Sequence, residues 1–309
     1  MSLLAKSALS LACAASLVAC VPQEDAPGAI SRAIPTPDQV RIKLPADATR
    51  TIGQLADWYV ATRGVTLTLN TGTGWVLALI HTIVQFPVTS VSGDTYTWGP
   101  WSGALDPAEY KLDVHALPDG TFAYQLEGRS KLTPGSSFEV IIDGVADPRP
   151  GHLQGNGSFL VDFDASRRVN PIDSDPDARG SVGVTYDLAA RHLDLTLMST
   201  DGNGQPVLAD YQYNETLDGG GDMVFDIDAD AGGTPALERV TLRSRWQSDG
   251  AGRADARLTG GDLATEAIAS ECWNTSFRRV YYTDNVSLAP TEGNVADCAF
   301  GTADLPPAP

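Results

Sequence analysis

The chain has 309 residues, of which 42% are hydrophobic and 19% are charged, and its formal net charge at pH 7 is -18. This length allows one large domain or two small ones. So acidic a balance excludes binding to nucleic acid, or to anionic lipid headgroups, by charge alone. It is compatible with a solvated surface, with cationic partners or with divalent cations.

The N-terminal residues have the organisation of a bacterial secretion signal. Lys6 supplies a cation, and residues 8–19 form an apolar h-region that is shorter than the ~20 residues of a membrane-spanning helix. This region ends in Leu-Val-Ala-Cys at Cys20, which resembles the lipobox of bacterial lipoproteins. The alternative is an ordinary secreted signal with a chance cysteine near its end.

The resemblance to lipoproteins has consequences for location. It implies cleavage before Cys20 and acylation of this residue with fatty chains such as palmitate, which would anchor the protein in a membrane. Because Val21 follows the cysteine, where an inner-membrane retention signal usually has Asp, the resemblance implies sorting to the outer membrane. The body would then face either the periplasm or the cell surface.

Composition divides the chain into four parts. The signal peptide covers residues 1–19, and residues 20–47, rich in Pro, Ala and charge, predict a semi-extended tether. Residues 48–300 are expected to form a single β-rich domain with a helical segment at its start. The tail at 301–309 ends in Pro-Pro-Ala-Pro and is expected to be disordered.

Two segments near the start of the domain indicate helices. Residues 51–62 place apolar side chains at helical spacing and predict a short helix. Residues 75–86 gather their polar members on one side of a helical wheel and stop before Pro87. This pattern predicts a buried helix, with a buried strand as the alternative.

From residue 95 onward, apolar and polar residues alternate. Residues 110–126 predict a β-hairpin, because two alternating runs flank the turn Pro118-Asp119-Gly120. The same alternation recurs in segments 138–142, 159–163, 182–186, 193–197, 209–213, 223–227 and 240–242. Short links and about ten strands in series predict a mainly β fold, a large curved antiparallel sheet or barrel with one or two short N-terminal helices. The helix at 75–86 would cover its mouth or concave face.

Two cysteines remain if Cys20 is acylated and Cys13 is removed with the signal. Cys272 and Cys298 then form an even pair in an oxidising compartment, which predicts a disulfide. On the chain-entropy model such a bridge would stabilise the fold by roughly 3 kcal/mol.

An aspartate cluster is a candidate calcium site. Asp226, Asp228 and Asp230 stand at alternate positions, which resembles the start of a DxDxDG calcium loop, where hard oxygens surround Ca²⁺. The segment departs from that pattern with Ala231 at the invariant glycine, and it lacks a glutamate at the twelfth position. A second cluster covers residues 173–177. In both places the alternative is a solvated strand end or turn, and no other cofactor is expected.

Basic residues are sparse but locally concentrated. Five arginines fall within two neighbouring predicted strands: Arg239, Arg243, Arg245, Arg253 and Arg257. If these strands pair across the turn at Asp249, a cationic patch suited to phosphate or carboxylate forms. The favoured alternative is cross-strand ion pairing with Asp255 and Glu238.

Aromatic residues and histidines give no catalytic signal. Trp98 and Trp101 flank Gly-Pro and could stack on sugar rings, but such residues more often close the end of a sheet, as Trp273 could near the disulfide. The sequence has no GxSxG, SxxK or HExxH motif, and its histidines at 81, 115, 152 and 192 are scattered. An enzyme is therefore not expected.

Two functions follow from these patterns. The first is a non-enzymatic envelope lipoprotein that binds a hydrophobic or amphipathic ligand in a curved sheet, a plan that resembles the half-barrel and helices of periplasmic lipoprotein carriers. The alternative is a structural or interaction module that binds an envelope protein or a glycan, with calcium as a stabiliser of its loops. Both include a membrane contact through the lipid anchor and neither includes nucleic acid.

Overall fold

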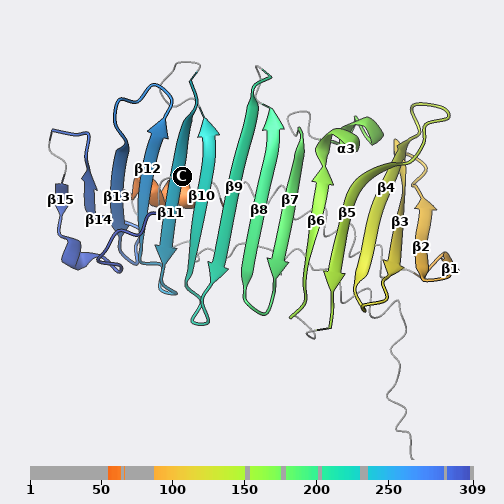
Figure 1. The fold of residues 1–309 in the computed structure, drawn as a ribbon, viewed down its shortest axis with the longest axis horizontal. Helices are drawn as coiled ribbons and strands as arrows, with labels where there is room; N and C mark the ends of the chain where they lie inside the picture. The colour runs from red at the N-terminus through yellow and green to blue at the C-terminus, as the bar shows by residue number, and fades with distance from the viewer. Residues whose placement is uncertain are drawn as a thin grey trace, which may run out of the picture.

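A computed structural model of the protein describes residues 55–63, 66, 87–149, 154–174, 179–200, 204–229, 236–288 and 291–306. Within these residues, one antiparallel sheet of 15 strands runs in chain order from β1 to β15 (Figure 1). Each strand pairs with the strands that precede and follow it in the chain. The sheet is therefore an open meander with β1 and β15 at its edges, and not a barrel.

The first eight strands are β1 (Ser90–Ser92), β2 (Thr95–Trp101), β3 (Ala108–Ala116), β4 (Phe122–Ser130), β5 (Glu139–Asp147), β6 (Asn156–Asp162), β7 (Ser181–Asp187) and β8 (His192–Thr200). The others are β9 (Pro206–Glu215), β10 (Gly221–Ala229), β11 (Glu238–Trp246), β12 (Gly252–Gly260), β13 (Ala267–Trp273), β14 (Arg279–Asp284) and β15 (Thr291–Gly293). Three short helical elements accompany them in the described residues: a helix at residues 57–63, α3 (Phe163–Val169) and the 3₁₀ turn η1 (Val295–Asp297).

The prediction of a mainly β fold with a large antiparallel sheet is confirmed. Of the two architectures considered, an antiparallel sheet and a barrel, the structure has the sheet. The sequence indicated about ten strands and the described residues contain more. The additional strands lack clean alternation: β1 and β15 have 3 residues each, β2 is interrupted by Gly99-Pro100, β13 has small side chains on both faces, and β14 is partly buried at nearly every position.

The hairpin at 110–126 forms as predicted. Leu112 pairs with Leu126 and Val114 pairs with Tyr124 across β3 and β4. Continuing from Tyr124, a row of apolar side chains crosses the sheet on one face, which we call the apolar face: Tyr124, Phe159, Val184, Leu195, Tyr211 and Leu242. Each of these six side chains is at most 4% exposed. Burial on this scale contributes ~1.5–3 kcal/mol per large side chain and is the main source of stability.

Aromatic rings on the apolar face lie over glycines of the neighbouring strand. The cross-strand pairs are Tyr124 with Gly144, Tyr186 with Gly157, Trp246 with Gly221, and Trp273 with Gly252. A Cβ atom built at any of these glycines would lie under 3.0 Å from the aromatic side chain. The glycines therefore leave room for the rings to lie flat on the sheet, and the rings cover backbone that a glycine would otherwise expose.

A helix at residues 57–63 covers part of the apolar face, which confirms part of the helix predicted at 51–62. Glu271 of β13 is fully buried, and its carboxylate oxygens accept hydrogen bonds from the backbone amides of Asp57 (3.2 Å) and Trp58 (2.6 Å). A carboxylate at a helix N-terminus satisfies free amides and complements the helix dipole. The sheet thus supplies the cap that starts the helix.

Two contacts fix the side of this helix that faces the sheet. The Tyr59 ring stacks on Phe277 with 4.3 Å between ring centroids, and the Thr62 and Ser244 hydroxyls lie 2.6 Å apart. The helix therefore lies against β11–β13, behind the sheet in Figure 1. At the opposite end of the sheet, α3 places Val169 against Gly128 and Ile141.

Several predictions fall outside the described residues. These are the signal peptide, the acylated Cys20, the tether at 20–47 and the helix at 75–86. The C-terminal tail differs from the prediction of disorder where it is described. Residues 301–306 lie on the sheet because arginines of β11 and β12 donate hydrogen bonds to the carbonyls of Thr302 and Pro306.

Candidate functional site

The face of the sheet opposite to the apolar face is polar, and we call it the polar face. Its side chains form rows that follow the strand register. One row contains His115, Ala123, Val145, Ser158, Thr185, Asp194, Gln212, Val224, Arg243, Asp255 and Ser270. The next contains Asp113, Gln125, Asp143, Leu160, Gly183, Thr196, Asp210, Asp226, Thr241 and Arg257. Both rows change along the sheet, from neutral and acidic side chains near β3 to arginines at β11 and β12.

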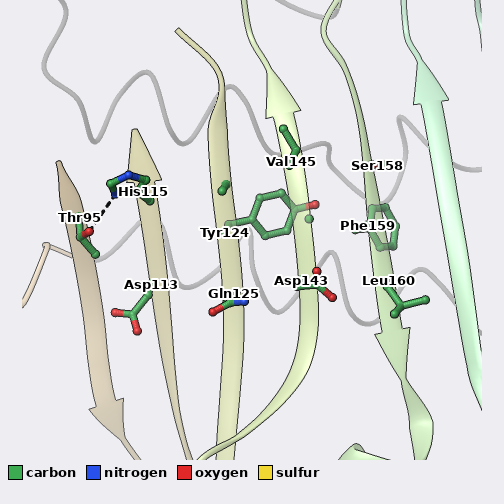
Figure 2. Close-up of a pocket in the computed structure, with 12 residues that line it drawn as sticks. Thr95, Asp113, His115, Tyr124, Gln125, Asp143, Val145, Ser158, Phe159 and Leu160 are labelled. Atoms are coloured by element: carbon green, nitrogen blue, oxygen red, sulfur yellow. Dashed lines mark hydrogen bonds between the residues drawn. The ribbon is translucent and has the colours of Figure 1, made fainter. Parts of the chain in front are cut away.

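Across β2–β6 the polar face is hollowed into a groove of about 590 Å³, which we call the β2–β6 groove (Figure 2). The small side chains of Ala123 and Ser158 lie in it, on either side of Val145 in one row. Asp113, Gln125 and Asp143 stand beside them on adjacent strands. Short side chains next to longer ones produce the hollow.

Three polar side chains of the groove are available to a ligand. Gln125, Asp143 and Ser158 are exposed, and none of them makes a side-chain hydrogen bond with another described residue. They offer an amide, a carboxylate and a hydroxyl, which together donate and accept hydrogen bonds.

The end of the groove at β2 and β3 is internally paired. Asp113 accepts hydrogen bonds from the Thr97 hydroxyl (2.5 Å) and from Lys111 Nζ (2.9 Å), and the His115 Nδ1 lies 3.0 Å from the Thr95 hydroxyl. Partial burial lowers the pKa of Lys111, but the carboxylates of Asp113 and Glu127 outweigh this and raise it. The polar side chains of β2 and β3 are therefore held by hydrogen bonds to one another, whereas Gln125, Asp143 and Ser158 on β4–β6 are not.

Apolar surface lies next to the free polar groups. Val145 is 41% exposed and Leu160 is 39% exposed, and both line the groove beside Asp143. The groove thus presents hydrogen-bonding groups and C–H surface side by side.

The groove does not assemble a nucleophile with a base. His115 on β3 and Ser158 on β6 belong to one row and are three strand steps apart. At ~4.8 Å per step they are separated by ~14 Å, far beyond hydrogen-bond reach. What the arrangement can do is hold a polar ligand by hydrogen bonds.

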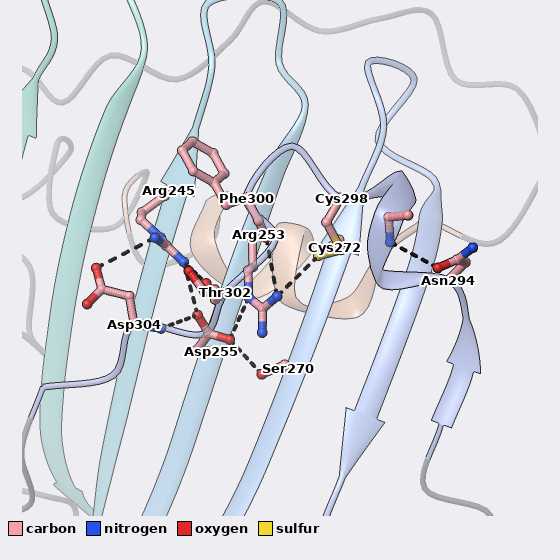
Figure 3. Close-up of a disulfide and its surroundings, with 11 residues drawn as sticks. Arg245, Arg253, Asp255, Ser270, Cys272, Asn294, Cys298, Phe300, Thr302 and Asp304 are labelled. Carbon is pink, nitrogen blue, oxygen red and sulfur yellow. Dashed lines mark hydrogen bonds and ion pairs between the residues drawn. A yellow bond between two sulfur atoms is a disulfide. The ribbon is translucent and has the colours of Figure 1, made fainter.

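At the other end of the polar face, the arginines form an ion-pair network (Figure 3). β11 and β12 pair across the turn at Asp249, as considered from the sequence, and their register places Arg245 opposite Arg253. Asp255 is fully buried and accepts hydrogen bonds from Arg253 Nε (2.8 Å) and from the Ser270 hydroxyl (2.5 Å), and Arg245 lies 3.5 Å away. Ion pairing with Asp255 is therefore confirmed. Glu238 is also buried and accepts a hydrogen bond from the Asp262 amide.

Residues 299–306, which we call the C-terminal strap, cross this network (Figure 3). Arg253 donates to the carbonyl of Phe300 (3.2 Å), Arg245 to that of Thr302 (2.6 Å) and Arg257 to that of Pro306 (2.6 Å). The strap follows directly on the disulfide between Cys272 and Cys298, whose Cα atoms are 5.4 Å apart. The predicted disulfide is confirmed, and it fixes the start of the strap on β13.

The candidate calcium ligands lie on β10 next to Arg239. This arginine is 3.5 Å from Asp226 and 3.3 Å from Asp228, and the Thr241 hydroxyl donates to Asp226. Asp230 lies outside the described residues, as does most of the second cluster at 173–177. In the part of the chain that the structure describes, no three His, Cys, Asp or Glu side chains are grouped as metal ligands.

A smaller pocket of about 400 Å³ separates the two ends of the polar face. Asp194, Asp210 and Asp226 line it from three adjacent strands, and Pro306 of the C-terminal strap borders it. Each of these carboxylates has a local partner: Thr196 donates to Asp210, Thr241 donates to Asp226, and the His192 Nε2 lies 2.8 Å from Asp194.

The tryptophans considered as sugar platforms are mostly buried. Trp98 is 2% exposed and Trp273 is 1% exposed, and the Trp273 indole N–H donates to the carbonyl of Gly250. Both are buried, as expected for aromatic residues with a structural role, whereas Trp101 is partly exposed.

Sequence reasoning did not find the β2–β6 groove or the C-terminal strap. The groove residues look like the solvated half of alternating strands, and only the register shows that Gln125 and Asp143 are neighbours.

Among the described residues, no helix has the length and apolar character needed to span a membrane. No family model matches the chain, and comparison with curated proteins and with solved structures gives no match either.

Proposed function

We propose that this protein is a non-enzymatic, lipid-anchored binding module of the bacterial outer membrane, and that its β2–β6 groove holds a glycan. The anchor rests on the lipobox at Cys20. The binding role rests on one observation: Gln125, Asp143 and Ser158 lie free in a groove of about 590 Å³. This volume falls within the ~300–1,000 Å³ of ligand sites in proteins.

The chemistry of the groove favours a hydroxyl-rich ligand. Sugar hydroxyls donate to carboxylates such as Asp143 and exchange hydrogen bonds with amides such as Gln125. The C–H faces of sugar rings pack on apolar side chains, and Val145 and Leu160 offer such surface beside Asp143. A saccharide of the cell envelope combines both features.

A hydrophobic ligand is less well supported. The apolar side chains that would hold it, such as Tyr124, Leu195 and Tyr211, are at most 4% exposed. The β2–β6 groove and the smaller pocket both open on the polar face. We therefore favour the interaction module over the hydrophobic-ligand carrier.

The glycan proposal is tested by calorimetric titration with soluble peptidoglycan fragments and with outer-membrane polysaccharide. Asp143→Asn and Ser158→Ala should each raise the dissociation constant about fivefold, because a lost hydrogen bond is worth ~1 kcal/mol. Two matched controls lie outside the groove: Asp297→Asn on η1 and Thr185→Ala on β7.

The outcomes separate the two partners of an interaction module. Binding that Asp143→Asn weakens and Asp297→Asn leaves unchanged supports a glycan in the groove. Absence of binding to both glycan classes, or equal binding by all variants, contradicts the glycan proposal and leaves a protein partner.

The anchor has its own test. In a bacterial host the wild-type chain should incorporate labelled palmitate and sediment with outer membranes, whereas Cys20→Ala should do neither. Labelling of the Cys20→Ala variant would contradict the assignment of this cysteine.

A further inference from the structure

We propose that the polar face of β10–β13 is a docking site for an extended acidic peptide of a partner protein, and that the C-terminal strap occupies this site in the isolated chain. This proposal concerns a second site and does not depend on the glycan groove. It rests on the way in which the strap is held.

The contacts of the strap are mostly with its main chain. Arginines of β11 and β12 donate hydrogen bonds to the carbonyls of Phe300, Thr302 and Pro306. The backbone amide of Asp304 donates to the Asp255 carboxylate (3.1 Å). Carbonyls at alternate positions belong to any extended peptide, whatever its sequence. The surface is therefore suited to main-chain recognition, as in other sites that bind extended peptides.

Two side chains of the strap add selectivity. The Asp304 carboxylate lies 3.4 Å from Arg243 and 3.7 Å from Arg245, and the Phe300 ring lies 4.9 Å from the Arg245 guanidinium. These contacts define the chemistry of the partner, which is an extended segment with one carboxylate and one aromatic ring four residues apart.

The strap is an imperfect ligand for these arginines. Charge-assisted hydrogen bonds to carboxylates are ~2.7–2.9 Å long, and the contacts of Asp304 are longer. The Nε atoms of Arg243 and Arg245 are buried and have no hydrogen-bond partner among the described residues. A peptide whose carboxylate reaches these atoms would bind more tightly per contact than the strap does.

The site stays formed when the strap leaves. Arg243 pairs with Asp222 (2.7 Å), Arg253 with Asp255 (2.8 Å) and Arg257 with Glu266 (3.4 Å), all on the sheet or its connections. Residues 301–304 of the strap are exposed, so they bury little apolar surface against the sheet. Attachment through the disulfide keeps the strap at a high local concentration, which explains how a weak ligand can occupy the site.

The test uses the full chain and a fluorescent peptide with the sequence of residues 299–306. Phe300→Ala with Asp304→Asn loosens the chain's own strap, and this variant should bind the peptide at least tenfold more tightly than the wild type. Arg243→Gln in the loosened variant, or Asp304→Asn in the peptide, should remove most of the gain. Asp297→Asn, a charge change beside the strap, should have no effect. A chain that ends at Cys298 provides a second acceptor, with its fold checked by circular dichroism.

Three results would overturn the proposal. In the first, neither the loosened nor the shortened chain binds the peptide more tightly than the wild type. In the second, binding does not depend on the peptide's Asp304. In the third, the loosened chain forms dimers without peptide, which would make the strap of a second copy the occupant. A failure of glycan binding would not affect any of these readouts, because they report on β10–β13 alone.

Discussion

The two ends of the polar face are built from the same antiparallel strands, but they differ in how far their polar side chains are buried and hydrogen-bonded. In the β2–β6 groove, Asp143 is exposed and makes no side-chain hydrogen bond with a described residue. On β12, Asp255 is fully buried and has Arg253, Ser270 and the Asp304 amide as partners. The comparison shows that the register of the sheet alone does not make a binding surface. A surface is open to a ligand where the chain leaves its own donors and acceptors unpaired.

The largest expected effect comes from the same substitution at the two ends. Asp255→Asn should lower the free energy of unfolding by about 3–5 kcal/mol, because it removes the charge that compensates the buried Arg253 and the partly buried Arg245. Asp143→Asn should change it by no more than about 0.5 kcal/mol, since an exposed group loses little on substitution. Urea unfolding of both variants measures the difference. Equal effects would show that the two ends do not differ as described.

The disulfide gives the next effect. Cys272→Ala with Cys298→Ala should lower the free energy of unfolding by about 3 kcal/mol, because the closed loop restricts the unfolded chain. Hydrogen exchange should then speed up in the C-terminal strap and β13–β15, with no change in β3–β6. Faster exchange at both ends would mean that the disulfide supports the whole sheet.

The smallest effect concerns acid pH at the strap end. The backbone amide and hydroxyl of Ser287 donate to Asp284 and lower the pKa of this carboxyl to about 2. Because the folded-state pKa lies below the unfolded value of ~3.9, the stabilisation is present above pH ~4 and is lost as the pH falls towards 2. Asp284→Asn should therefore be less stable than the wild type at pH 7, with the difference disappearing near pH 2. A difference that does not vary with pH would contradict this assignment.

The sequence predicted the features that depend on local pattern. The hairpin at 110–126 combines alternation with a Pro-Asp-Gly turn, and the pairing of Cys272 with Cys298 needed only a count of the remaining cysteines. The features that it missed depend on neighbours that are distant in sequence. Gln125 and Asp143 become adjacent only through the register of β4 and β5.

The contacts of the C-terminal strap also join residues that are distant in sequence, and the sequence pattern did not predict them. A Pro-rich tail without periodicity predicts disorder, and residues 301–306 are held instead by arginines about fifty residues earlier in the chain. Alternation on β11 and β12 placed the arginines together and favoured their ion pairing with Asp255, but it did not indicate the segment that covers them. The sequence predicts which residues of a strand share a face, but it does not predict which part of the sheet an irregular segment such as the C-terminal strap contacts.

The most direct test of the account is a methyl NMR titration of the protein with peptidoglycan fragments and outer-membrane polysaccharide. Val145 and Leu160 line the β2–β6 groove, and Val224 lines the smaller pocket near the C-terminal strap. A glycan bound in the β2–β6 groove should shift the methyl resonances of Val145 and Leu160 and leave those of Val224 in place. Shifts at Val224 without shifts at Val145 and Leu160, or no shifts at all, would contradict the claim that the open end of the polar face is the binding site.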